Sequence, residues 1–291
     1  MSDRSSGEPV PDGGVPEEFD DVGADASEAA DGPGETDGSP GIAVAVAVGL
    51  GVLGPLIALT SGAVVFAVDA VTGGLPLAAT LVLTLIFGQY VAFGGLAVAY
   101  LSWRGFDRDG IVSYLGVRVP SVKEIGIVFG SWVVILVLIL VVSSIVQLLG
   151  TEAASNQSAE LAMGNPAIIP LLIVASFLVI GPCEELLYRG VVQGRLRESL
   201  PAVPAIVLSA AIFAAIHVMA LTGGASARLT TITILFVPSL VFGAVYEYTE
   251  NLVVPALLHG LHNAVLFTAL YVAVTQFEGE ELPAVLGFLP V

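Results

Sequence analysis

Charged side chains are scarce in this 291-residue sequence, and it contains a single lysine and a single cysteine. Charged residues make up 12% of the chain and hydrophobic residues 56%, whereas about a quarter of a soluble domain is charged. This imbalance excludes a soluble cytosolic enzyme and predicts a polytopic membrane protein. The lone Cys183 excludes a disulfide framework and a cysteine-rich zinc or iron–sulfur site, and we interpret it as a packing residue. No basic patch is present to neutralise phosphates, so nucleic acid is not expected as a partner.

The acidic charge is concentrated at the start of the chain. Residues 1–40 contain 12 acidic residues and one basic residue, Arg4. An acidic stretch rich in glycine, proline and serine, with Phe19 as its one aromatic residue, buries too little apolar surface to offset chain entropy. It also lacks the pattern of a signal peptide. We therefore predict a disordered cytoplasmic tail over 1–40, and this acid-rich, lysine-poor composition is typical of salt-loving organisms.

After residue 40 the chain is a series of apolar segments, each long enough to cross a membrane as a helix of about 20 residues. Strict alternation of apolar and polar residues is absent, which excludes a transmembrane barrel. The predicted fold class is all-α, a polytopic transmembrane helical bundle of about seven spans. Residues 275–291 form a short mixed segment, so an eighth span stays open. The predicted spans are 41–68, 75–102, 125–149, 166–194, 203–221, 229–247 and 252–274.

Lysine and arginine are distributed unevenly between the two ends of these spans. If the N-terminus is cytoplasmic, eight of the nine basic residues lie on the inside and Arg228 alone lies outside. Cytoplasmic loops carry an excess of these residues, so we predict a multi-pass protein of the cell membrane with a cytoplasmic N-terminus. The eight are Arg4, Arg104, Arg108, Arg118, Lys123, Arg189, Arg195 and Arg197.

Ionisable side chains inside the spans are few, and such residues are costly in lipid and indicate function by default. They occur in three spans, and the helix rise of about 1.5 Å per residue places them at comparable depths, which predicts one buried polar cluster. Spacing of four residues predicts a pair between Glu185 and Arg189 and a common face for His259 and Asn263. His262 is assigned to support or packing. The complete set is Glu184, Glu185, Arg189, His217, His259, His262 and Asn263.

Three short motifs follow one another in chain order within these spans. Glu184-Glu185-x-x-x-Arg189, Phe213-x-x-x-His217 and His259-x-x-x-Asn263 are similar to the three motifs of the CAAX-protease and bacteriocin-processing (CPBP) family of intramembrane endopeptidases, which includes type II CAAX prenyl endopeptidases. The resemblance covers about residues 165–270. It divides the membrane part into N-terminal transmembrane helices (41–164), a CPBP-like catalytic transmembrane core (165–274) and a short C-terminal segment (275–291).

The resemblance implies an endopeptidase that hydrolyses a peptide bond of a membrane-associated substrate with a glutamate-activated water. By the same resemblance, Glu184 with His217 would activate the water, and His259 and Asn263 would stabilise the oxyanion. The expected partners are membrane lipid and a protein or peptide substrate, with lipidation of the substrate left open. The supporting residues are Glu185, Arg189 and Phe213.

Two alternatives stay open at this point. A zinc-dependent protease of the same family would use Glu184, His217 and His259 as ligands, but the HExxH motif is absent and this donor set does not require a metal. We therefore expect no cofactor, with zinc as the alternative. The other alternative is a non-catalytic membrane scaffold or a proton-coupled transporter that uses the cluster as a proton relay. The absence of recognisable inverted repeats weakens the transporter interpretation.

Overall fold

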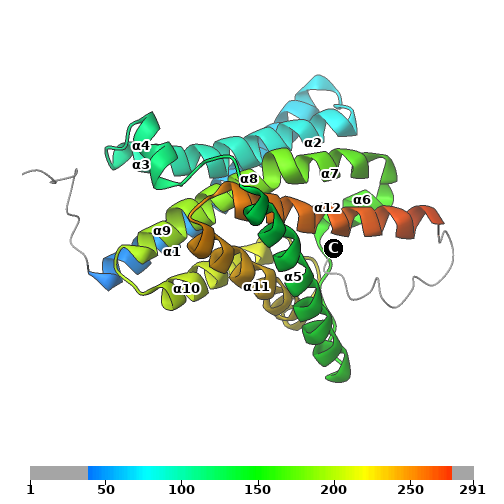
Figure 1. The fold of residues 1–291 in the computed structure, drawn as a ribbon. Coiled ribbons are helices and arrows are strands. Elements are labelled where there is room, and N and C mark those ends of the chain that lie inside the picture. The colour runs from blue at the N-terminus through cyan, green and yellow to red at the C-terminus, as the bar shows by residue number, and fades with distance from the viewer. Residues whose placement is uncertain (1–38, 277–291) are drawn as a thin grey trace, which may run out of the picture. The chain divides into compact units, whose positions relative to one another are not determined.

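The computed structural model describes residues 39–276, and seven of its helices are long and apolar enough to cross a membrane (Figure 1). This confirms the predicted all-α helical bundle. The predicted tail up to residue 38 and the segment from residue 277 onward lie outside the described residues. The seven spans are Pro40–Thr72, Leu77–Trp103, Val122–Leu148, Pro166–Arg197, Ala202–Ala220, Ala225–Thr249 and Val253–Gln276.

Five of the spans are formed by one main helix each. Two short helices lie in the connections, α4 (Arg108–Tyr114) before the third span and α6 (Gln157–Gly164) before the fourth. The main helices are α1 (Pro40–Thr72), α5 (Val122–Leu148), α10 (Ala202–Ile216) with the 3₁₀ turn η5 (His217–Ala220), α11 (Ala225–Thr249) and α12 (Val253–Gln276).

The second and fourth spans are interrupted by π-helical segments, a wider winding that is frequent at functional sites. The second span consists of α2 (Leu77–Leu85), the π-helix η1 (Ile86–Gly95) and α3 (Leu96–Trp103). The fourth span contains two π-helices. Its segments are η2 (Pro166–Ile168), α7 (Ile169–Ala175), η3 (Ser176–Ile180), α8 (Gly181–Glu185), η4 (Leu186–Gln193) and α9 (Gly194–Arg197).

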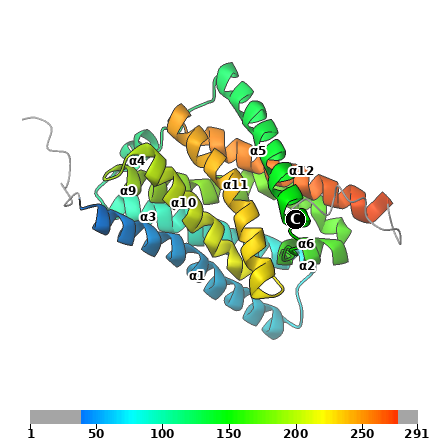
Figure 2. The same ribbon diagram turned by 90° about the horizontal axis from the view of Figure 1, so that it is seen from below.

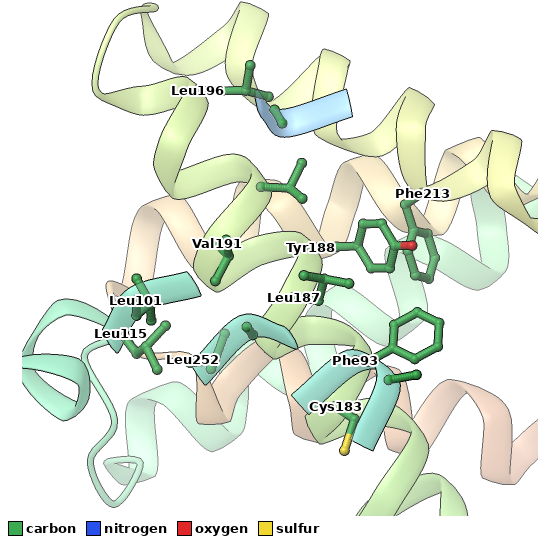
Figure 3. Close-up of a cluster of buried hydrophobic side chains, with 14 of the residues drawn as sticks. Phe93, Leu101, Leu115, Cys183, Leu187, Tyr188, Val191, Leu196, Phe213 and Leu252 are labelled. Carbon is green, nitrogen blue, oxygen red and sulfur yellow. The ribbon is translucent and has the colours of Figure 1, made fainter. Parts of the chain in front are cut away.

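The fourth span is the centre of the bundle. Every residue of η4 from Leu187 to Gln193 is buried. A helix that is buried all round needs neighbours on every side, and α1, α10 and η1 supply them for η4. Figure 3 shows the resulting cluster, in which Leu187 and Tyr188 pack with Phe93 of η1 and Phe213 of α10. Figure 2 shows α10 lying between α1 and α11.

Two glycines allow α12 to pack closely along the fourth span, beside α7, η3 and α8 (Figure 1). A Cβ atom on Gly181 would lie 2.8 Å from the carbonyl oxygen of Ala256, and one on Gly260 would lie 2.7 Å from the ring of Phe177. Small residues permit such close approach of helices in membranes. Gly181 precedes the two glutamates and Gly260 follows His259, so the contact brings the polar residues of the two spans together.

Candidate active site

Glu185 is the centre of a buried polar network that joins three spans. Its Oε2 atom forms an ion pair with Arg189 Nε at 3.1 Å, the pair that the four-residue spacing predicted, and both side chains are at most 1% exposed. Its Oε1 atom lies 2.8 Å from His259 Nδ1 on α12, a contact that the sequence did not predict. Arg189 Nη2 in turn donates to the carbonyl (3.0 Å) and the hydroxyl (2.9 Å) of Ser239 on α11.

Aromatic rings enclose this network. The Arg189 guanidinium lies 4.6 Å from the ring centroid of Phe213 and 5.4 Å from that of Phe242. The His259 ring stacks on Phe242 at 4.9 Å and meets the edge of Phe213 at 5.9 Å. These contacts fix the plane of the imidazole, and the buried guanidinium is stabilised by the faces of both rings as well as by Glu185.

Glu184 lies on the other side of His259, and its surroundings differ from those of its neighbour. Its Oε1 atom accepts a hydrogen bond of 2.9 Å from the side-chain amide of Gln89 on η1. Its Oε2 atom lies 3.9 Å from His259 Nε2, and the Glu184 side chain is 12% exposed. This separation is too long for a direct hydrogen bond and is one that a water molecule can bridge. The two glutamates therefore face the two nitrogens of one imidazole.

The hydrogen bond to Glu185 defines the protonation of His259. An ionised carboxylate only accepts hydrogen bonds, so we assign the proton to Nδ1. A neutral His259 then presents a lone pair at Nε2 toward Glu184, and an imidazolium presents a second donor there. The predicted role as oxyanion donor through Nε2 therefore requires the protonated ring.

His217 lies where α10 tightens into η5. Its Nδ1 atom is 2.7 Å from the carbonyl oxygen of Phe213, which can only accept, so Nδ1 carries the proton and Nε2 is left as an acceptor. The Phe213 ring lies 4.7 Å from the His217 ring and connects it to the His259 side of the cluster. No hydrogen bond or ion pair joins His217 to Glu184 within the described residues.

The remaining predicted residues lie near the cluster in different ways. Asn263 is half-buried one turn after His259 on α12, and no hydrogen bond of its side chain occurs among residues 39–276. His262 is buried with its ring edge toward Phe242, at 6.3 Å. Cys183 is buried in the hydrophobic cluster of Figure 3.

The donor set of the zinc alternative is not gathered into a metal site in this conformation. In the part of the chain that the structure describes, no group of three or more histidine, cysteine, aspartate and glutamate side chains could hold a metal ion. Glu184, His217 and His259 therefore do not fit a zinc ion as they stand here.

Sequence reasoning missed Gln89 and Ser239, although a signal existed for the first. Gln89 is the one amide side chain in Leu77–Trp103, a span without charged residues. A polar group that is buried in lipid needs a hydrogen-bond partner, so this amide could have been assigned to the cluster. Ser239 is one of several hydroxyl residues in its span, and the sequence does not distinguish it from the others.

The fold and the site define a multi-pass membrane protein with a buried glutamate–histidine cluster between its spans. Residues 166–265 match the family model described as type II CAAX prenyl endopeptidase Rce1-like, which confirms the predicted resemblance over the segment that carries all three motifs. No curated protein and no solved structure matches the chain closely. The family match implies a protease, and Gln89 lies outside the matched segment.

Proposed function

We propose that the protein is an intramembrane endopeptidase in which Glu184 activates the water that hydrolyses a peptide bond. One observation carries the proposal: of two adjacent glutamates, Glu184 alone has no arginine partner among the described residues, is partly exposed, and lies 3.9 Å from an imidazole nitrogen. A carboxylate that is not bonded directly to a guanidinium can take up a proton during the reaction, as a general base must.

The reaction begins with a water held between Glu184 Oε2 and the imidazoles. Glu184 takes a proton from the water as its oxygen bonds to the carbonyl carbon, and the carbonyl π electrons move to the oxygen. The tetrahedral oxyanion then collapses, the C–N bond breaks, and Glu184 returns the proton to the leaving nitrogen. The products are a carboxylic acid and an amine, and the glutamate ends as it began.

The charges of the cluster support His259 as an oxyanion donor. Glu184, Glu185 and Arg189 together carry a formal charge of −1, and a protonated His259 brings the cluster to zero. A neutral charge balance is favourable in a low-dielectric site. The imidazolium donates from Nε2, and the amide of Asn263, one turn away on the same helix, is a second donor for the developing oxyanion. His217 Nε2, an acceptor, helps to orient the water.

A zinc-dependent protease is the second candidate. Both His217 and His259 have their Nδ1 atoms bound to a backbone carbonyl or a carboxylate, which is the arrangement that metal-binding histidines show. In that case zinc would polarise the water and Glu184 would be one of three ligands. Because the three side chains are not gathered in this structure, we derive no step through the metal.

The substrate is a membrane-associated protein or peptide, in keeping with a site inside the bundle and with the family description.

The N-terminus is cytoplasmic. Arg189 is neutralised by Glu185 inside the bundle, so we leave it out of the count of basic residues that orients the protein. Seven lysine and arginine residues then lie on the cytoplasmic side and Arg228 alone lies on the outer side, which favours this orientation.

Proteoliposomes with a library of membrane-anchored peptides, prenylated and unprenylated, test the proposal by mass spectrometry of the products. We expect cleavage by the wild type and by Glu152→Gln, an exposed loop carboxylate used as a matched control. Glu184→Gln should be inactive. Activity that survives 1,10-phenanthroline as well as its non-chelating isomer supports the metal-free mechanism, and loss with the chelator alone supports zinc. Cleavage by Glu184→Gln at the wild-type rate would contradict both.

A further inference from the structure

Gln89 brings a neutral donor to the proposed base from a span outside the family match. Its Nε2 atom lies 2.9 Å from Glu184 Oε1, between residues 95 positions apart in the chain. Because an ionised carboxylate cannot donate, the amide must present its NH₂ group to Glu184, which defines its orientation. The amide oxygen Oε1 is buried and has no hydrogen-bond partner among the described residues.

Close packing of the second span against the fourth holds the Gln89 amide beside Glu184. Gln89 lies in the π-helix η1, whose residues Phe93 and Gly94 are buried against the fourth span. A Cβ atom on Gly94 would lie 3.7 Å from the sulfur of Cys183, the residue immediately before Glu184. The two helices are therefore in direct contact beside the hydrogen bond, and Gln89 reaches Glu184 from within the π-helical segment.

A neutral hydrogen-bond donor such as the Gln89 amide suits a carboxylate that acts as a general base. An arginine in place of Gln89 would hold Glu184 in a direct ion pair, as Arg189 holds Glu185. A neutral amide engages one oxygen and adds no charge, so the carboxylate keeps its capacity to take up a proton. With Oε1 engaged, Oε2 is the atom left to face His259 Nε2 and the water between them.

We propose that Gln89 is a positioning residue that holds Oε1 of Glu184, so that Oε2 is the atom that takes the proton from the water. This inference rests on the proposed function of Glu184 as the base. It extends the catalytic site to the second span, which the three motifs do not include.

The test compares purified variants in proteoliposomes with the best peptide from the library. Gln89→Met removes the donor at nearly constant size, and kcat should fall on the order of tenfold with KM and the melting temperature unchanged. Thr84→Val, on the same span, is the matched control, because that hydroxyl bonds only to its own helix, and it should behave like the wild type. Glu184→Gln is measured in parallel and should be inactive.

Gln89→Glu gives a readout that a purely structural bond would not change. At alkaline pH the introduced carboxylate repels Glu184, and at mildly acidic pH one proton shared by the pair restores a donor to Glu184. The kcat of Gln89→Glu relative to Gln89→Met should therefore rise several-fold as the pH falls. The same titratable and charged neighbours are present in both variants, so the ratio isolates the introduced group. They are His217, His259, Cys183, Glu185, Tyr188 and Arg189.

The outcomes separate this inference from the function on which it rests. Wild-type kcat in Gln89→Met with an inactive Glu184→Gln would overturn the role of Gln89 and leave the protease proposal standing. A lower melting temperature of Gln89→Met, together with a kcat ratio of Gln89→Glu to Gln89→Met that does not change with pH, would show a structural bond. This result would also overturn the role of Gln89. An active Glu184→Gln would overturn the proposed function and this inference together.

Discussion

The two sides of the His259 ring offer the clearest comparison in the molecule. On the Nδ1 side, Glu185 is fully buried with Arg189, and this network extends to Ser239. On the Nε2 side, Glu184 is partly exposed and bonded to a neutral amide. Adjacent residues of the same type therefore have opposite environments. One environment stabilises a permanent charge and orients the imidazole, and the other leaves a carboxylate able to react.

Removal of the buried cation should have the largest effect on stability. Arg189→Met leaves Glu185 unpaired where neither side chain is more than 1% exposed, and the loss should be about 3 to 5 kcal/mol. The unfolding midpoint in detergent is the measurement, and Arg228→Met in the first turn of α11 is the control. A variant as stable as the wild type would show that the Nδ1 side is not a structural network.

A substitution that adds a side-chain atom at the contact between α12 and the fourth span should have the next largest effect on stability. In Gly260→Ala, the added methyl group would lie 2.7 Å from the Phe177 ring, so α12 must shift, at a cost of about 1 to 3 kcal/mol. The shift also moves His259, and kcat should fall together with the melting temperature. Gly126→Ala is the control, because a Cβ atom there has no neighbour within 4 Å. Equal effects of the two substitutions would contradict the role of the close contact.

A smaller effect on stability is expected at Ser239, where the network of Glu185 and Arg189 ends. Ser239→Ala removes the hydroxyl that accepts from Arg189 Nη2 and leaves the backbone carbonyl as acceptor, so the loss should be about 1 kcal/mol. The melting temperature should fall slightly, and kcat should stay close to that of the wild type. A large loss of kcat with unchanged stability would place Ser239 in the catalytic machinery instead.

The smallest effect is expected from the acidic N-terminal segment. Deletion of residues 1–38 removes none of the residues of the cluster, so cleavage should stay within a few-fold of the wild type. The measurement is cleavage by a truncated protein whose insertion has been verified by protease protection. Complete loss of cleavage in a well-inserted truncation would show that the chemistry depends on the segment.

The spans could be predicted from the sequence because the membrane thickness sets the length of an apolar helix, and the observed ends differ from the predicted ones by a few residues. The Glu185–Arg189 pair followed from spacing on one helix. Contacts between helices could not be predicted in the same way. The bonds from Gln89 to Glu184 and from His259 to Glu185 depend on how each helix is rotated, and the π-helical segments change that rotation without a signal in hydropathy.

The most direct test of the central claim is a paired measurement of kcat and melting temperature for Glu184→Gln and Glu185→Gln. Loss of the general base should lower kcat on the order of a hundredfold or more in Glu184→Gln, with the melting temperature of the wild type. Glu185→Gln should lower the melting temperature, because it leaves Arg189 without its buried counter-ion. If Glu184→Gln retained wild-type kcat, or if Glu184→Gln unfolded while Glu185→Gln stayed stable, the division between a reactive and a structural glutamate would be wrong.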